Sequence, residues 1–409
     1  MNALDVDFAR SQFPAFAEPS LAQFAHFENA GGSYACGQVV EALDGYYRRT
    51  KVQPYYAFEP SAIAGARMDS ARQRLAQWLN ADVDEVHLGP STSQNTYVLA
   101  QAFRRWLRPG DEIVVTNQDH EANIGAWARL QDEGFTVRTW KVDAAGTLQL
   151  QDLRALLSPR TRVVAFTHCS NVVGQINPVR EITDLIHGAG ALAVVDGVSY
   201  APHGLPDMTE LGADIYLFSL YKVYGPHLGA TYVRRDLASQ LPSQAHFFKS
   251  GELPGRFTPA GPDHAQVAAV NGVIDYMEAL ASHHGYAQAP LQQRAAAVRT
   301  LMRGQEIRLL EPLLDFMARQ PRIRVIGPFD ARTRAPTVAF MIDGLSSQAV
   351  GAELARQGIG VGAGNFYAYR LLQALGIDTT DGVVRASFVH YTTPAEVDRL
   401  VAALAATLR

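Results

Sequence analysis

The chain has 409 residues, more than one hydrophobic core usually holds, so we expect two domains. Hydrophobic residues make up 47% and charged residues 19%, an ordinary composition for a folded protein. The net charge of −4 comes from 36 basic and 40 acidic residues without a long run of either sign. This pattern argues against a protein that binds nucleic acid or an anionic membrane.

The sequence also gives expectations about compartment and metal binding. No apolar run is long enough to cross a membrane, and the N-terminus lacks the basic start and apolar centre of a signal peptide. The two cysteines, Cys36 and Cys169, share no metal-binding spacing and are too few for a disulfide framework. We therefore expect a cytoplasmic protein without a metal site.

Short apolar runs alternate with segments of helical periodicity between about residues 84 and 235. This alternation is typical of a mostly parallel sheet covered by crossover helices, and wholly apolar runs indicate strands buried on both faces. The expected strands are 112–116, 136–140, 162–168, 191–197, 214–219 and 230–234. The expected helices are 94–107, 123–134, 150–157 and 179–190.

A segment rich in glycine, proline and serine, about 235–265, predicts a loop-dominated crossing out of this α/β region. A long helical stretch at about 265–320 follows it. An α+β C-terminal domain is then predicted from the strand candidates 323–326, 336–342, 358–364 and 383–391. We expect an N-terminal segment (1–28) that packs with this small domain, a large domain (29–265), and a linking helix with the small domain (266–409).

Only four of the 36 basic residues are lysines, and one differs from the others. Lys51, Lys141 and Lys249 lie in polar surroundings and are interpreted as surface charges. Lys222 instead follows the apolar run DIYLFSLY, at the end of an expected buried strand, where α/β sheets build their sites. Burial favours the neutral amine, the form that makes a Schiff base with a carbonyl. The structural alternative is a lysine whose amine reaches solvent from the strand end.

Further polar side chains are expected at the same edge of the sheet. Asp196 ends a hydrophobic strand and could hold the protonated nitrogen of a heteroaromatic ring, although aspartates also form turns there. Thr92 and Ser93 come at the start of a helix, where such hydroxyls either cap the helix or bind a phosphate. His120 also follows a strand, and its flat ring could stack on a cofactor or carry protons.

Two more candidates suit a substrate carboxylate. Asn171 follows another expected strand, and Arg385 lies on an otherwise apolar strand of the second domain. A buried arginine needs a partner, which is either a carboxylate or phosphate ligand or an internal salt bridge. Together the candidates indicate an enzyme that uses pyridoxal 5′-phosphate (PLP).

The sequence resembles the class V aminotransferase family, and within it the cysteine-desulfurase-like branch related to SufS proteins. The resemblance runs from FENAGGS (27–33) to VRASFVHYTTPAEVDRL (384–400). Its most specific pieces, in order, are DHEANIGAW, HCSNVVGQINPV, VVDGVSYAPH and FSLYKVYGPHLG. The resemblance implies the α/β fold type I of PLP-dependent transferases: a large domain with a mostly parallel sheet, a smaller α+β C-terminal domain, and a homodimer.

The resemblance also implies a role for each candidate. Lys222 would be the Schiff-base lysine, Asp196 the partner of the pyridinium nitrogen and His120 the ring that stacks on the cofactor. Phosphate contacts are implied for Thr92, Ser93 and Ser219, and substrate-carboxylate contacts for Asn171 and Arg385. The remaining positions are placed around the cofactor (Ser199, Tyr221 and Gly261) or beside the substrate (Asn365 and Tyr367).

The sequence departs from the family where sulfur chemistry takes place. Desulfurases of this branch have a persulfide-forming cysteine in a segment resembling GIxVRTGHHCA; this chain reads GIGVGAGNFYA (358–368), with Tyr367 at the cysteine position and Gly362 at the arginine. Tyr221 replaces the histidine before the lysine, and Ser199 replaces a glutamine. The segment resembling RFExGTP, which reaches the partner subunit's phosphate, reads RFTPAGP, so Gly261 offers only its backbone.

We therefore expect a PLP-dependent enzyme that acts on a small-molecule α-amino acid by elimination or carbon–sulfur (Cβ–heteroatom) bond cleavage, without a persulfide intermediate. Lys222 would move the Cα proton, and Asp196 would keep the pyridine nitrogen protonated. Aminotransferase and epimerase activities share these first steps and stay open as alternatives.

Two hypotheses from other classes are weaker. GVSYA (197–201) resembles the serine elbow of α/β hydrolases, with Ser199 as the nucleophile and Asp263 and His264 as downstream acid and base. These two residues are adjacent in a loop, which argues against a triad. A scaffold without activity is the other hypothesis, and the intact Lys222 argues against it.

Overall fold

The strands expected in the middle of the chain form one sheet in the computed structural model, which describes residues 3–409. Its members are β2 (Val86–Gly89), β3 (Glu112–Thr116), β4 (Thr136–Trp140), β5 (Thr161–Thr167), β6 (Leu192–Asp196), β7 (Ile215–Ser219) and β8 (Gly229–Val233). They lie in the order β2-β8-β7-β6-β5-β3-β4. Only β8 runs against the others, because it pairs antiparallel with both β2 and β7 while the remaining pairs are parallel.

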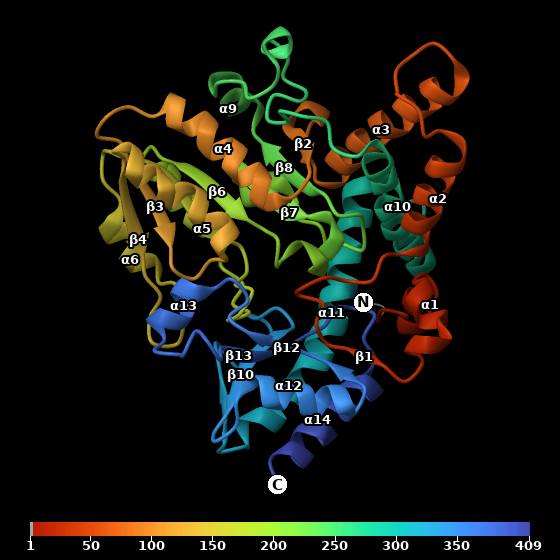
Figure 1. Cartoon of the computed structure of the whole chain (residues 1–409), viewed down its shortest axis with the longest axis vertical. Helices are drawn as coiled ribbons and strands as arrows, with labels where there is room; N and C mark the ends of the chain where they lie inside the picture. Colours follow the sequence, from red (N-terminus) through yellow and green to blue (C-terminus); the bar gives the residue numbers. More distant parts are fainter. Residues whose placement is uncertain (1–2) are drawn as a thin grey trace.

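Helices cover both faces of this sheet (Figure 1). One face is covered by α4 (Thr92–Trp106) and α5 (Glu121–Ala128), whose Phe103 and Trp127 pack on its apolar residues. The opposite face is covered by α2 (Gly37–Arg49), α3 (Glu59–Trp78), α6 (Leu150–Leu156), α7 (Val179–Gly188), α8 (Met208–Leu211) and α10 (His264–Ala281). Double-sided burial explains the wholly apolar strands, whereas β4 lies at the sheet edge and is partly exposed.

A smaller antiparallel sheet lies in the C-terminal part, where the sequence predicts an α+β domain. It contains β9 (Ile323–Val325), β10 (Thr337–Ile342), β12 (Gly362–Gly364) and β13 (Val383–Ser387), in the order β12-β13-β10-β9. Its core is completed by α11 (Leu291–Ala318), α12 (Ser347–Arg356) and α14 (Pro394–Thr407). A short helix, α13 (Tyr369–Ala374), packs against Val172 and Val173 of the large sheet's loops, so it joins the two parts beside the sheet edge.

The N-terminal segment contacts both parts. Residues 1–2 lie outside the described residues, and α1 (Val6–Ser11) begins just after them. Phe13 packs in the core of the large part, whereas Phe27 packs in that of the small part. The strand β1 (Ala25–His26) pairs in parallel with β11 (Ile359–Gly360). We propose the domain limits 1–28, 29–265 and 266–409, with an N-terminal segment that bridges the two domains.

The structure differs from the expected elements at several breaks. The helical stretch at 265–320 divides into α10 and α11, because Gly285 has a left-handed φ of 89° and Pro290 precedes α11. The candidate 358–364 divides into β11 and β12, and 383–391 ends as a strand at Ser387. The loop-rich crossing contains the short helix α9 (Arg235–Gln240) and a 3-10 turn (Phe247–Lys249), and β2 is a strand that the sequence pattern did not predict.

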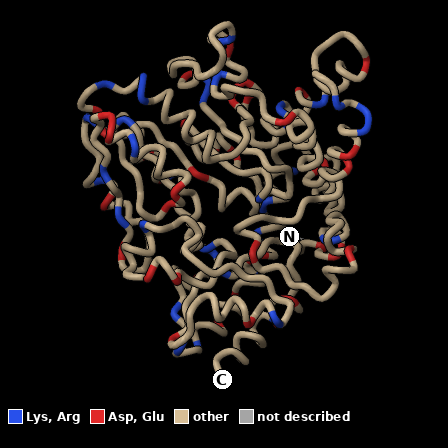
Figure 2. The backbone as a smooth tube through the Cα atoms, in the orientation of Figure 1, with Lys and Arg blue, Asp and Glu red and all other residues tan. Residues whose placement is uncertain are grey.

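Positions of basic and acidic residues are spread along the backbone over the whole molecule (Figure 2). Within residues 3–409, none of the helices combines the length and the apolar character needed to span a membrane.

Candidate active site

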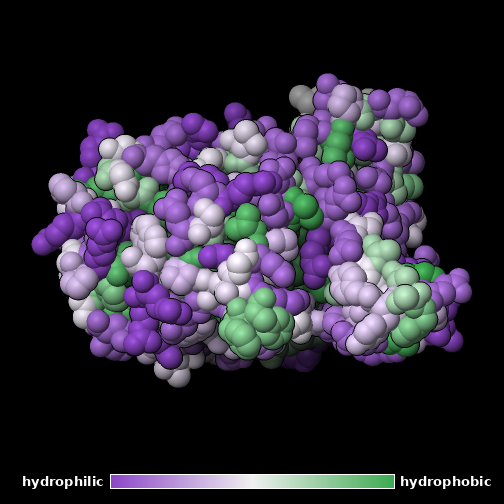
Figure 3. All heavy atoms as spheres, turned by 90° about the horizontal axis from the view of Figure 1, so that it is seen from above, coloured by the Kyte–Doolittle hydropathy of each residue, from purple (hydrophilic) through white to green (hydrophobic). Residues whose placement is uncertain are grey.

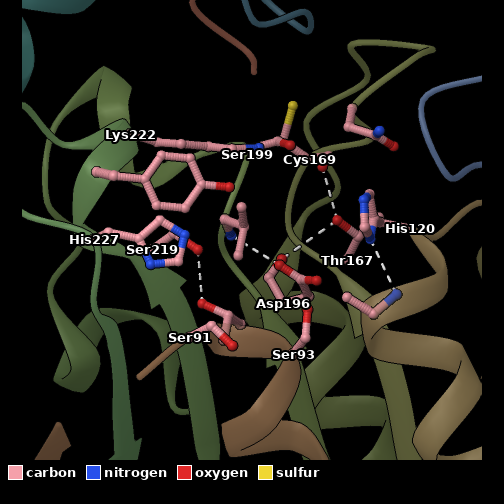
Figure 4. A pocket seen from close by; sticks show the side chains of 15 residues that line it. Ser91, Ser93, His120, Thr167, Cys169, Asp196, Ser199, Ser219, Lys222 and His227 are labelled. Atoms are coloured by element: carbon pink, nitrogen blue, oxygen red, sulfur yellow. Dashed lines mark hydrogen bonds between the residues drawn. The ribbon is translucent and has the colours of Figure 1, made fainter. Parts of the chain in front are cut away.

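A cavity opens at the carboxyl ends of the large sheet's parallel strands (Figure 4). The space inside it, open mouth included, is about 620 Å³. The lining comes from chain segments that follow β3, β5, β6 and β7 and from the start of α4. It consists of Ser91, Thr92, Ser93, His120, Ala122, Thr167, Cys169, Asn171, Asp196, Val198, Ser199, Ser219, Tyr221, Lys222 and His227.

Lys222 lies in the short 3-10 turn Leu220–Lys222 that directly follows β7. The residue is 7% exposed, and its amine lies 5.9 Å from the centroid of the Tyr221 ring. Burial lowers the pKa of this amine from its ordinary value of 10.5 to about 8; the nearby Arg385 lowers it further, and Asp196 opposes the shift. The lowered pKa increases the fraction of neutral, nucleophilic amine near neutral pH compared with an ordinary lysine.

Asp196 is the last residue of β6, and one of its carboxylate oxygens accepts the Val198 N–H at 2.8 Å. Burial raises the pKa of this carboxyl to about 6, against the effects of the Val198 hydrogen bond and Lys222. Behind it lies Asp119, which sequence reasoning missed and whose pKa burial raises to about 8. A buried carboxylate with so little compensating charge fits a ligand that brings a positive N–H, as the pyridine ring of PLP does.

His120 caps the N-terminus of α5. Its Nδ1 accepts the Ala122 N–H at 3.0 Å, so the neutral ring carries its proton on Nε2. Burial, with smaller effects from Lys222 and Arg385, lowers the pKa of this ring to about 3. The cavity thus contains a flat, uncharged imidazole at neutral pH, which suits stacking on a planar ring.

Hydroxyl groups gather where α4 begins. The Ser91 hydroxyl accepts the Gln94 N–H at 3.2 Å, and the Thr92 and Ser219 hydroxyls lie 2.8 Å apart. A Cβ atom on Gly229 would stand 2.5 Å from the Thr92 nitrogen, so glycine at this point of β8 lets the strand approach the helix start. Helix N–H groups without intrahelical acceptors, beside three hydroxyls, fit the phosphate of PLP.

Two aromatic rings stand beside these hydroxyls. Tyr221 stacks on His227, with ring centroids 4.9 Å apart and planes within 6°. Sequence reasoning identified Tyr221 but missed His227, although it lies in YGPHLG only five residues after Lys222. Ser91, which with Thr92 and Ser93 was expected to cap the helix or bind a phosphate, also lines the cavity, as do Thr167 and Cys169.

Arg385 stands next to this cavity and joins it to the small domain. Its Nη1 donates to the Asn171 carbonyl at 3.1 Å, and the Asn171 amide donates to the Phe366 carbonyl at 2.9 Å. Its Nη2 donates to the Glu28 carboxylate at 2.6 Å. The internal salt bridge considered for Arg385 is therefore present. Burial lowers the pKa of this arginine, and Glu28 opposes that shift.

The segment 362–368 contacts residues on this side of the site. The Tyr367 carbonyl accepts the Glu121 N–H at 2.8 Å, and the Tyr367 ring, 71% exposed, lies 5.2 Å from the His120 ring. The Asn365 side chain is occupied within its own loop, where it donates to the Thr379 carbonyl and accepts the Tyr367 N–H.

Three other candidates lie away from the cavity lining. Gly261 is in the exposed loop before α10. Asp263 caps α10 by accepting the Gln266 N–H at 3.0 Å, and neither it nor His264 lines the cavity that Ser199 lines. The serine-hydrolase hypothesis therefore lacks its acid and base.

The fold joins a mostly parallel sheet to a small antiparallel domain. The site combines a buried lysine and aspartate at the strand ends with hydroxyls at a helix start. Together they define a PLP-dependent enzyme of fold type I. The family described as aminotransferase class-V matches residues 25–400, and the chain belongs to this family, which uses PLP.

The known proteins most similar to this chain include both aminotransferase-like proteins and desulfurases. The aminotransferase-like protein FGM3 of Gibberella zeae is 36% identical, and the match covers 98% of this chain and 98% of that protein. A cysteine desulfurase of Serratia proteamaculans is 30% identical over 98% of this chain and 97% of its own. The fold matches the apo structure of a cysteine desulfurase from Thermococcus onnurineus NA1, with a TM-score of 0.86 at 23% identity, covering 100% of this chain and 99% of that one.

Proposed function

We propose that this PLP-dependent enzyme acts on an α-amino acid by elimination or carbon–sulfur (Cβ–heteroatom) bond cleavage, without forming a persulfide on the protein. The observation that carries this proposal is the chemistry of the loop beside His120. Tyr367 occupies the position of the family cysteine, and a phenol cannot carry sulfane sulfur.

The two thiols elsewhere in the chain support the same proposal. Cys36 and Cys169 are both buried, and burial raises the pKa of each thiol to about 12. Since the thiolate is the nucleophile in sulfur transfer, neither cysteine is suited to accept sulfur from a substrate at neutral pH. Two buried, unpaired cysteines also support a cytoplasmic location, which we propose on that ground.

Different residues around the cavity would bind the phosphate and the pyridine ring of PLP. Thr92, Ser93 and Ser219 would bind the phosphate, with Ser199 and Tyr221 close by. Asp196 would accept the pyridine N–H, and the neutral ring of His120 would lie against the cofactor ring. When bound, PLP supplies an electron sink for the electron pair left by a bond broken at the substrate Cα.

The chain's own residues would then handle the substrate carboxylate and the proton. Arg385 and Asn171 would hold the α-carboxylate on the small-domain side, with Asn365 and Tyr367 in the loop above. The Lys222 amine would take the Cα proton and return it, because burial lowers the pKa of this amine and so raises its neutral fraction near neutral pH. Segment 362–368 would limit the access of water from this side.

Product analysis with L-cysteine tests the proposal. Elimination yields pyruvate, ammonia and sulfide in equal amounts, whereas desulfuration yields alanine and sulfur held on the protein. Transamination would give an oxo acid without free sulfide, and epimerisation would give D-cysteine. Thiol alkylation followed by intact-mass analysis should show no added sulfur; a sulfur-bearing mass that is lost in Cys36→Ser or Cys169→Ser would overturn the proposal.

We also propose a homodimer. Exposed aromatic side chains on the end of α2, on the α2–α3 connection and on the segment before α10 support it: Tyr47, Tyr55, Tyr56, Phe58, Phe247 and Phe248. Hydrophobic patches interrupt the otherwise hydrophilic surface in the view from above (Figure 3). In such a dimer Gly261 would offer its backbone to the partner subunit's cofactor. A monomer by sedimentation with full cofactor occupancy would contradict this.

A further inference from the structure

Glu28 places a carboxylate in the site where a substrate carboxylate is expected. Its Oε1 accepts from Arg385 Nη2 at 2.6 Å, and the Arg385 side chain is only 4% exposed. Its charge also acts on Lys222 and Tyr221 and opposes the lowering of the Lys222 pKa by burial. The pair therefore belongs to the site and is not a surface ion pair.

The surroundings of Arg385 fit a ligand better than a permanent internal pair. Its Nε and the Asn171 Oδ1 are both buried without a hydrogen-bond partner among the described residues. Buried polar atoms without partners cost free energy in an empty site and gain it back when a ligand supplies partners. The guanidinium is held from the other side by the Phe366 ring, whose centroid lies 3.9 Å away.

Gly362 explains how Glu28 reaches this position. A Cβ atom there would stand 2.7 Å from the Glu28 Oε1 and 2.6 Å from the Phe366 ring. This position is the one where the family pattern described above has an arginine. The absence of a side chain at Gly362 therefore leaves room for both Glu28 and Phe366 against Arg385.

The contacts of Glu28 allow it to release Arg385 without losing its anchor. Its two oxygens have different partners, because Oε1 contacts Arg385 while Oε2 accepts the Gly31 N–H at 2.8 Å. The Glu28 side chain is 27% exposed, so solvent can replace the lost contact. A competing carboxylate that offers two oxygens to Arg385 can form a bidentate pair, which a single Glu28 oxygen does not.

We infer that Glu28 is a displaceable gate on the substrate-carboxylate site: it occupies Arg385 in the free enzyme, and the substrate carboxylate must displace it. Displacing Glu28 costs free energy, so Glu28 lowers the apparent affinity of the enzyme for amino acids. The inference rests on the proposed function, in which Arg385 holds the substrate carboxylate.

Removing the charge of Glu28 while keeping its shape tests this gate. The probes are L-alanine and ethylamine, which share the amine but differ in the carboxylate, and binding is read from the visible absorption band of the PLP-loaded enzyme. Glu28→Gln should bind L-alanine about tenfold more tightly and ethylamine with unchanged affinity. Gly362→Ala should act in the same direction, because its methyl group displaces Glu28. Glu41→Gln, on the exposed face of α2, is the matched control and should change neither probe.

The outcomes separate the gate from the proposed function. If Glu28→Gln binds L-alanine more tightly than the wild type while its affinity for ethylamine is unchanged, the gate is supported. The same holds if L-alanine binding is measurable in the variant and too weak to measure in the wild type. Equal or weaker binding of L-alanine in Glu28→Gln overturns the gate and leaves the proposed carboxylate site intact. If no variant binds L-alanine while all bind ethylamine, Arg385 is not the carboxylate site, and both proposals fail.

Discussion

Replacing the buried lysine by an apolar residue of similar length should stabilise the protein when the cofactor is absent. In Lys222→Met the burial of an amine is exchanged for the burial of a thioether, with similar volume at a 7% exposed position. A lysine pKa lowered from 10.5 to about 8 means that folding at pH 7 costs ~3 kcal/mol for this group alone. Holding Lys222 in a reactive state thus has a cost in stability.

The sign of the pH dependence follows from the lowered pKa. Between pH 8 and 10.5 the unfolded chain binds the proton and the folded chain does not, so the penalty shrinks as the pH rises. The difference in unfolding free energy between Lys222→Met and the wild type should fall from ~3 kcal/mol at pH 7 to about half that at pH 9.5.

Guanidinium chloride unfolding of both proteins at these two pH values, after the cofactor is removed with hydroxylamine, measures this difference. Lys249→Met is the matched control, because Lys249 is exposed, and it should show no such gain. A wild type as stable as Lys222→Met at pH 7, or a difference that grows with pH, would refute the assignment of a depressed pKa to Lys222.

Three substitutions separate the parts of the site. Arg385→Ala should weaken amino-acid binding by ~2 to 5 kcal/mol and leave PLP occupancy unchanged, as titration of the visible band would measure; loss of PLP with unchanged amino-acid affinity would contradict the role. Asp196→Asn should slow exchange of the Cα hydrogen of L-alanine in D₂O by about 30-fold, since an amide replaces a charged acceptor worth ~2 kcal/mol. An exchange rate by NMR equal to that of the wild type would count against the role of Asp196. His227→Ala should weaken PLP about fivefold but pyridoxal not at all, because His227 lies beside the hydroxyls of Ser91 and Ser219; equal losses would place it against the ring instead.

The sequence was sufficient for the sheet and for the residues at its carboxyl edge. β3 and β4 were predicted residue for residue, because wholly apolar or β-branched runs of five residues between helices have few other interpretations. Lys222, Asp196 and His120 follow different strands, and parallel strands bring their carboxyl ends to one edge, so these side chains meet in one cavity as expected.

Contacts between distant segments were beyond the reach of sequence patterns. Glu28 and Arg385 are 357 positions apart, and their pairing depends on how the N-terminal segment crosses between the two parts of the molecule. Asp119 was missed because a buried acid beside a histidine has no periodicity to reveal it. The break between α10 and α11 is different, because Pro290 is a stop signal that the sequence shows; only the left-handed φ of Gly285 needed the structure.

The central claim is that Lys222 binds PLP covalently, and borohydride reduction followed by peptide mass spectrometry tests it most directly. We expect a yellow protein whose visible band is bleached by borohydride and whose reduced pyridoxyl group is found on the peptide that contains Lys222. The same treatment of Lys222→Ala should leave no adduct. A reduced adduct on Lys51, Lys141 or Lys249, or a wild-type protein without a visible band after incubation with PLP, would contradict the claim.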